Sequence, residues 1–164
     1  MFSMFLKFRN KYHVIENAGT MHVGDNFFVH RGPVPSLLKT YVGGSIVFLD
    51  DCCMGHASMI VARKMIRIGH RVRIGSYVSI LDCDDDVVPD LDSEREAKPI
   101  LIEDDVVMGS RVTIYKGSMI GAGSVILDGA VVFGDVPANS YVEGNPACVF
   151  PMGRERLGLS CVQA

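Results

Sequence analysis

The sequence lacks the features of zinc-binding, disulfide-stabilised and membrane-spanning proteins. Its five cysteines are odd in number, Cys52 and Cys53 are adjacent, and no pair has the C-x-x-C spacing. This pattern argues against a zinc site and a disulfide framework, and it predicts a reducing, cytoplasmic location. No apolar run approaches the roughly 20 residues that a transmembrane helix needs. The N-terminus also lacks the layout of a signal peptide, because its charges follow its apolar residues.

A surplus of positive charge is also missing. The 164 residues carry a formal net charge of −3 and show no basic stripe, so nucleic-acid binding is not expected. Apolar residues make up 48% of the chain, which is ample for a core. The length suits one domain.

What the chain does contain is a six-residue repeat between residues 102 and 136. An aliphatic residue returns at every sixth position: Ile102, Met108, Ile114, Ile120, Ile126 and Val132. A small or branched residue follows each of these four positions later: Val106, Val112, Ser118, Ser124, Ala130 and Val136. This period fits neither an amphipathic helix nor an alternating strand, and it is typical of a parallel β-helix.

We therefore predict an all-β chain in which each hexapeptide forms one short strand and one corner. Three hexapeptides make a triangular coil, and the two repeated side chains point inward and stack on those of the next coil. The alternative is a β-sandwich of short strands, which fits less well because its turns are not spaced so evenly.

The repeat divides the chain into three parts. Residues 23–150 form the β-helix, and residues 151–164 form a C-terminal tail. Residues 1–22 are predicted to pack on the open end of the β-helix and protect its edge. A weak peripheral membrane contact through the apolar and basic residues 1–12 is the alternative for this segment.

Three interruptions are expected within the β-helix. Residues 30–44 contain two prolines and a glycine pair, which indicates an excursion between coils. A shift of the repeat by two residues predicts an irregular corner near residues 63–65. The acidic stretch 82–98 lies outside the repeat and is predicted to be a protruding loop.

Three stretches carry a resemblance to a known family. They are MIVARKMIRIGHRVRIGSYVSILD at 59–82, KPILIEDDVVMGSRVTIYKGSMIGAGSVI at 98–126 and DVPANSYVEGNPACVF at 135–150. The chain resembles the hexapeptide-repeat acyltransferases, in particular the sugar and polysaccharide O-acetyltransferases such as the maltose and galactoside enzymes. The resemblance implies a left-handed parallel β-helix, a homotrimer, acetyl-CoA as the acyl donor and a sugar hydroxyl as the acceptor.

Acetyl transfer to a hydroxyl needs a base that removes the hydroxyl proton. In the resembled family this base is a histidine of the protruding loop, in a pattern like I-x-D-x-D-x-H. The matching stretch here places Asp82 and Asp84 at the two aspartate positions and Asp86 at the histidine position. Asp86 is therefore one candidate base, because neighbouring carboxylates would raise its pKa.

His56 is the other candidate base. It follows Gly55, which occupies a position where the family often has a polar residue facing the cleft between subunits. Its imidazole could then approach the acceptor from the neighbouring subunit. The alternative is a surface histidine with an ordinary hydrogen bond. Asp82, Asp84 and Gly55 are the matching candidates for contacts with the acceptor.

The resemblance also assigns positions for coenzyme A, which the family binds in a groove between subunits. The matching residues are Ser110 and Gly144-Asn145-Pro146. The Thr-Lys pair that helps to hold the phosphate end in the family is replaced here by Phe133 and Gly134. Asp128 adds a negative charge where a small residue is usual. These departures predict weaker coenzyme A binding or a changed pose.

Two other functions stay open at this point. The missing histidine and Thr-Lys pair favour a trimer that binds a sugar or a partner without catalysis. Transfer to the amine of an amino sugar is the third possibility. A metal site is not expected, because the alternating aspartates 82, 84 and 86 lack the glycine and glutamate of a calcium loop.

Overall fold

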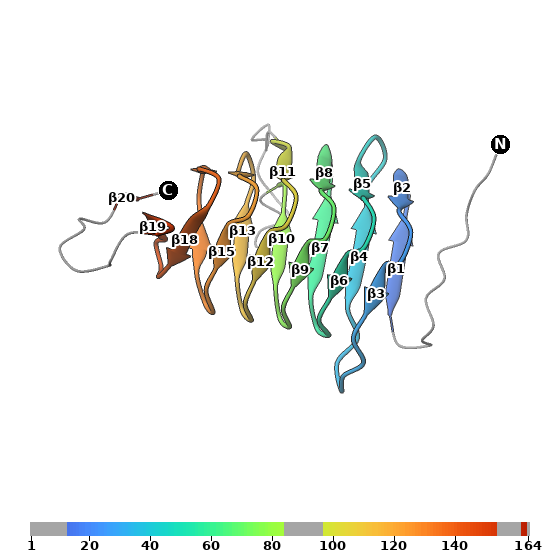
Figure 1. The fold of residues 1–164 in the computed structure, drawn as a ribbon. Helices are drawn as coiled ribbons and strands as arrows, with labels where there is room; N and C mark the ends of the chain where they lie inside the picture. Colours follow the sequence, from blue (N-terminus) through green and yellow to red (C-terminus); the bar gives the residue numbers. More distant parts are fainter. Residues whose placement is uncertain (1–12, 84–96, 154–161, 164) are drawn as a thin grey trace.

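The computed structural model describes residues 13–83, 97–153 and 162–163. Within these residues every regular element is a β-strand, and each strand from β1 to β15 pairs in parallel with the strand three places later. Three sheets therefore form the faces of a solenoid, and its coils lie side by side in sequence order (Figure 1). This confirms the predicted left-handed parallel β-helix.

Each sheet takes one strand from every coil. Sheet A contains β1 (Val14–Asn17), β4 (Leu37–Thr40), β7 (Met59–Ala62), β10 (Ser79–Leu81), β13 (Thr113–Tyr115) and β16 (Val131–Val132). Sheet B contains β2 (Thr20–Val23), β5 (Ser45–Phe48), β8 (Met65–Ile68), β11 (Ile100–Ile102), β14 (Met119–Ile120) and β17 (Asp135–Val136). Sheet C contains β3 (Phe28–Val29), β6 (Cys53–Met54), β9 (Arg73–Ile74), β12 (Val107–Met108), β15 (Val125–Ile126), β18 (Ser140–Glu143), β19 (Cys148–Pro151) and β20 (Val162–Gln163).

The six-residue repeat accounts for the core. All twelve repeated side chains between residues 102 and 136 are at most 3% exposed. Parallel pairing keeps them in register, with Ile102 beside Ile120 and Ile120 beside Val136. Each aliphatic side chain therefore packs on its counterpart one coil away, at the strand-pairing distance of roughly 4.8 Å.

The first coils differ from the sequence-based boundaries. Strands β1 and β2 pair with β4 and β5, so the coils begin at Val14 rather than at residue 23. All four β1 residues are exposed, which explains why the repeat is hard to see there. The expected excursion at 30–44 contains strand β4, whose Leu38 is buried. The packing of residues 1–12 on the open end concerns residues outside the described ranges and stays a prediction.

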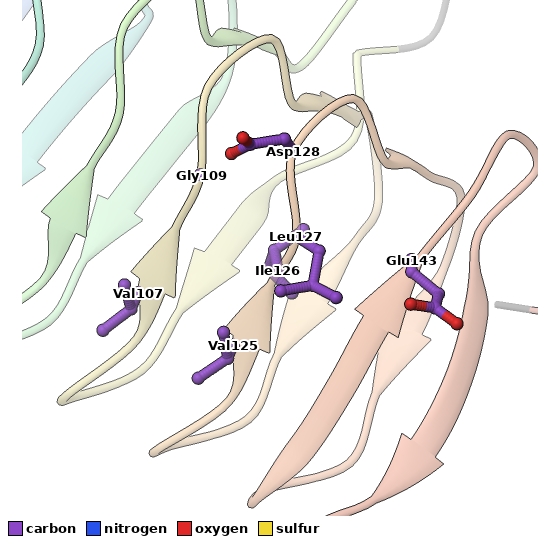
Figure 2. Close-up of a pocket in the computed structure, with 7 residues that line it drawn as sticks. All are labelled: Val107, Gly109, Val125, Ile126, Leu127, Asp128 and Glu143. Carbon is purple, nitrogen blue, oxygen red and sulfur yellow. The ribbon is translucent and has the colours of Figure 1, made fainter. Parts of the chain in front are cut away.

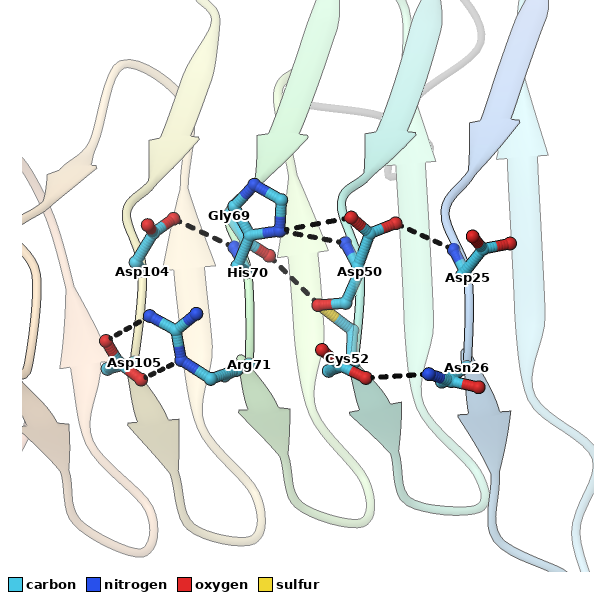
Figure 3. A network of polar contacts seen from close by, with 10 residues as sticks. Asp25, Asn26, Asp50, Cys52, Gly69, His70, Arg71, Asp104 and Asp105 are labelled. Carbon is cyan, nitrogen blue, oxygen red and sulfur yellow. Dashed lines mark hydrogen bonds and ion pairs between the residues drawn. The ribbon is translucent and has the colours of Figure 1, made fainter.

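The connections from sheet B to sheet C form a corner with many polar contacts, which we call the B–C corner (Figure 3). The carboxylate of Asp50 accepts the amide hydrogen of Asp25 at 2.8 Å, and that of Asp104 accepts the amide hydrogen of His70 at 2.8 Å. The Arg71 guanidinium donates two hydrogen bonds to Asp105, at 2.6 and 2.7 Å, and lowers the pKa of that carboxyl. The carboxylates thus tie each coil to the next.

The cysteines agree only in part with the expectation that the chain forms no disulfides. Cys148 in β19 is disulfide-bonded, contrary to the expectation that the chain forms no disulfides. Cys52 is a buried thiol, and burial raises its pKa to about 11. The basis for a reducing compartment is therefore weaker than the sequence indicated. The described ranges contain no helix that is long and apolar enough to cross a membrane.

Candidate functional site

The connections from sheet C to sheet A form a second corner, the C–A corner, and a row of glycines lies along it. Gly55, Gly75 and Gly109 directly follow β6, β9 and β12. A Cβ on Gly55 would meet the backbone of Gly75, and a Cβ on Gly75 would meet that of Gly109. Only glycine fits at these positions, because successive coils approach each other so closely.

The residues after these glycines fall into one column along the C–A corner. Their order is fixed by parallel strand pairing, which places Met54 beside Ile74, Ile74 beside Met108 and Met108 beside Ile126. The column therefore contains, from coil to coil, His56, Ser76, Ser110 and Asp128. Three coil steps separate its ends, which is roughly 14 Å at the spacing of paired strands.

His56 is held on three sides. Its Nδ1 lies 3.0 Å from the hydroxyl of Ser76, and the edge of its ring packs against the ring of Tyr77, with centroids 5.3 Å apart. The imidazole also fills the space that a side chain on Gly32 would need. Within the described residues the ring's hydrogen bond is made by Nδ1, and no hydrogen bond to Nε2 is found.

Ser110 and Asp128, two residues expected to contact coenzyme A, are directly bonded. The carboxylate of Asp128 accepts the amide hydrogen of Ser110 at 2.7 Å. Gly144 lies one coil beyond Asp128, because Ile126 pairs with Val142. The exposed segment Gly144-Asn145-Pro146 therefore ends the same column, and its Asn145–Pro146 peptide bond is cis. The structure thus brings these predicted positions together.

A shallow groove of about 550 Å³ lies beside this end of the column (Figure 2). Its walls are Val107, Gly109, Val125, Ile126, Leu127, Asp128 and Glu143. Val107 and Val125 are neighbours on the outer face of sheet C and give the groove an apolar floor. Asp128 and Glu143 add two carboxylates, which are a poor match for a phosphate group.

Phe133 and Gly134 lie elsewhere in the chain. They follow β16 at the corner between sheets A and B, the A–B corner, whereas Ser110 and Asp128 lie at the C–A corner. The Phe133 ring stacks on Tyr115, with centroids 4.4 Å apart and planes 9° apart. The amide of Gly134 donates to the hydroxyl of Ser118 at 3.1 Å. Within one chain these two residues do not join the column.

Asp82 has a structural role that the sequence did not reveal. It is fully buried, and its carboxylate accepts the amide hydrogens of Arg63, Lys64 and Met65 at 2.7, 2.7 and 2.8 Å. These amides form the short turn between β7 and β8, at the irregular corner that the shifted repeat predicts. With both oxygens engaged and no exposed surface, Asp82 does not fit the expected role of a substrate ligand.

Three further candidate residues, Gly55, Asp84 and Asp86, were expected to contact the acceptor or act as the base. Gly55 is buried and its backbone faces the next coil, so it shapes the corner and offers no side chain to an acceptor. Asp84 and Asp86, together with most of the predicted loop 82–98, lie outside the described residues. Their assigned roles stay predictions.

The sequence did not identify Ser76 or the groove walls other than Asp128. A signal for Ser76 was present, because Met54-Gly55-His56, Ile74-Gly75-Ser76 and Met108-Gly109-Ser110 share one pattern of an aliphatic residue, glycine and a polar residue. Val107 and Val125 also gave a signal, since both are apolar residues at outward positions of the repeat. Nothing in the local sequence marked Glu143.

Comparisons with known proteins support this assignment of the fold. No protein-family model matches the chain. A hexapeptide-repeat acetyltransferase from Vibrio cholerae is 30% identical, and the alignment covers 82% of this chain and 74% of that one with a TM-score of 0.66. Its structure with acetyl-CoA gives 29% identity, a TM-score of 0.65 and coverage of 82% and 72%.

Two other relatives give weaker support for the family assignment than the Vibrio cholerae protein does. A Staphylococcus aureus 2,3,4,5-tetrahydropyridine-2,6-dicarboxylate N-acetyltransferase is 42% identical over 59 residues, which is 36% of this chain. The match spans only 25% of that relative. The N-acyltransferase AntD from Bacillus cereus aligns over 89% of this chain and 79% of its own with a TM-score of 0.74, but at 14% identity it is similar in fold alone.

Proposed function

The chain belongs to the hexapeptide-repeat acetyltransferases, and we propose that it transfers the acetyl group of acetyl-CoA to a hydroxyl of a sugar or polysaccharide precursor. The observation that carries this proposal is the column on the C–A corner. It combines an imidazole with a free Nε2 and a groove two to three coils away. The Vibrio cholerae relative, whose structure contains acetyl-CoA, supports the choice of donor.

In this proposal His56 is the general base. Its Nε2 takes the proton of the acceptor hydroxyl, and the oxygen attacks the thioester carbonyl to give a tetrahedral oxyanion. The carbon–sulfur bond then breaks, and the thiolate of coenzyme A takes the proton from the imidazolium. The products are an acetyl ester and free coenzyme A, and His56 returns to its neutral form. Asp86, which lies outside the described residues, is the rival base.

The donor is proposed to lie along the column. The pantetheine arm of coenzyme A is a thin, flexible chain, which suits a shallow groove such as the one beside Ser110 and Asp128. The apolar floor formed by Val107 and Val125 suits the bulkier end of the molecule. The carboxylates of Asp128 and Glu143 oppose its phosphates, so we expect binding to be weaker than a neutral groove would give.

The proposal includes a homotrimer, in which the C–A corner faces a second copy of the chain. The apolar residues on the outer face of sheet C favour such a contact, because Val107 is 38% and Phe28 is 48% exposed in the single chain. A cytoplasmic location stays a prediction.

Transfer to an amine is the second candidate function. The Staphylococcus aureus relative is an N-acetyltransferase, and Asp128 and Glu143 would attract the positive charge of an amino sugar. An amine also needs a base, because only its neutral form attacks the thioester, so the column serves either acceptor.

A thiol-release assay with the full chain tests both candidates. Acetyl-CoA is offered with a panel of neutral sugars and amino sugars, and free coenzyme A is measured over time. Turnover with neutral sugars supports the O-acetyltransferase, and turnover with amino sugars alone supports the second candidate. Absence of turnover with every acceptor, despite coenzyme A binding in calorimetry, would overturn both and favour the non-catalytic alternative.

A further inference from the structure

Ser76 is the hydrogen-bond partner of His56, and it reaches that position through the register of the coils. Strand β6 pairs with β9, with Met54 beside Ile74, so residue 76 lies directly beside residue 56 on the C–A corner. The two side-chain atoms, Nδ1 and Oγ, are 3.0 Å apart. Among the described residues this hydroxyl is the ring's hydrogen-bond partner.

The imidazole has little freedom to choose another orientation. Its edge packs on Tyr77 at an interplanar angle of 72°, and Gly32 lies against the ring atoms. A ring flip would move Nδ1 away from the Ser76 hydroxyl and leave a carbon atom there. The surroundings therefore favour the orientation that directs Nδ1 toward Ser76.

The direction of this hydrogen bond decides what Nε2 can do. If Nδ1 carries the hydrogen and donates it to Ser76, Nε2 keeps a lone pair and can accept a proton. If the hydroxyl donates to Nδ1, the hydrogen of the neutral ring sits on Nε2, which then cannot act as a base. Ser76 is half-buried, so its own hydroxyl hydrogen can bond to water in the first arrangement.

We infer that Ser76 is a positioning residue, whose hydroxyl accepts the Nδ1 hydrogen of His56 and so keeps the lone pair on Nε2. The inference rests on the proposed function, because a base on the C–A corner needs this tautomer. It adds a residue that acts through His56 and does not touch the substrate.

Nuclear magnetic resonance can read the tautomer in the resting protein. In ¹⁵N-labelled full-length chain at alkaline pH, long-range ¹H–¹⁵N correlations should show His56 mainly with its hydrogen on Nδ1. Ser76→Ala should shift the ring toward the Nε2–H form, and Ser76→Thr should restore the native spectrum because it keeps a hydroxyl. Ser110→Ala, in the same column but without a bond to His56, should leave the tautomer unchanged.

Kinetics give a second readout. Ser76→Ala should lower kcat on the order of tenfold, well below the roughly 10⁴ measured for a carboxylate-held histidine with the wrong tautomer. KM for acetyl-CoA should stay unchanged, and Ser76→Thr should recover most of kcat. An Nε2–H tautomer in an active native protein overturns this inference alone. An Nδ1–H tautomer that responds to Ser76→Ala, in a protein without any transfer activity, supports the hydrogen bond and contradicts the proposed function.

Discussion

Two histidines in this chain follow the same local sequence and end in different surroundings. Met54-Gly55-His56 lies at the C–A corner and Ile68-Gly69-His70 lies at the B–C corner. At both corners the next residue has a positive φ near 56°. The backbone geometry is therefore the same, and the difference lies in the neighbouring coils.

Carboxylates surround His70. Its Nδ1 accepts the amide hydrogen of Asp50 at 3.2 Å and lies 3.5 Å from the Asp50 carboxylate, while its own amide donates to Asp104 (Figure 3). His56 instead has Gly32, the Tyr77 ring and the Ser76 hydroxyl around it. The B–C corner uses its polar groups to hold coils together, whereas among the described residues the C–A corner leaves Nε2 of His56 without a hydrogen bond and has a groove farther along it.

The largest expected effect separates the two histidines. His56→Ala should lower kcat by a factor of 10² to 10⁴, the usual contribution of a general base. His70→Ala is the matched control and should change kcat by about twofold at most. Thiol release from acetyl-CoA measures both. Equal losses for the two variants would mean that the corners do not differ in function.

Asp82 and Asp104 both accept backbone amide hydrogens, and their contributions to the stability of the fold can be compared. Asp82→Ala removes a buried carboxylate and leaves three part-buried amides of the β7–β8 turn without their acceptor, and it should lower the free energy of unfolding by about 3 kcal/mol. Asp104→Ala removes one cap at the half-buried B–C corner and should lower it by about 1 kcal/mol. Urea unfolding followed by circular dichroism measures both, and the reverse order would contradict the assigned roles.

The groove carboxylate should affect donor binding. Asp128→Asn keeps an oxygen for the Ser110 amide but removes a negative charge beside the groove. We expect coenzyme A to bind about fivefold more tightly, which corresponds to about 1 kcal/mol for one screened charge. Asp104→Asn at the B–C corner is the control. Calorimetry that finds no difference between the two variants would move coenzyme A away from Asp128.

The smallest effect concerns the exposed Arg71–Asp105 pair. Arg71 lowers the pKa of Asp105, so this stabilisation is present above the ordinary pKa of an aspartate, about 3.9, and is lost as pH falls through the lower folded value. Thermal unfolding should show Arg71→Ala slightly less stable than the native chain at pH 7. The difference should fade below about pH 3 and in high salt. A difference that persisted in acid would need another cause.

The repeat was sufficient to predict the fold, because each inward side chain occupies a fixed place in a six-residue period. The period predicted both the burial of Ile102 to Val136 and the irregular corner at 63–65. It could not show which residues of neighbouring coils lie side by side, because the coils differ in length. At the C–A corner the paired residues are 20 positions apart for Met54 and Ile74, 34 for Ile74 and Met108, and 18 for Met108 and Ile126. For that reason Ser76 was not recognised as the partner of His56.

The acidic stretch shows a second limit of the sequence. Asp82 begins a run of charged residues, and its composition indicates an exposed loop. The structure buries it, because three amides of the preceding coil need an acceptor at that place. Only the three-dimensional pairing of β7 with β10 reveals this need.

The most direct test of the C–A corner is an NMR titration of the ¹⁵N-labelled chain with coenzyme A. We expect shifts of the amides around His56, Ser76, Ser110 and Asp128, and unchanged signals for Asp50, His70 and Asp104 at the B–C corner. Shifts centred on the B–C corner, or on Tyr115 and Phe133 at the A–B corner, would contradict it. A spectrum unchanged by coenzyme A would contradict it as well.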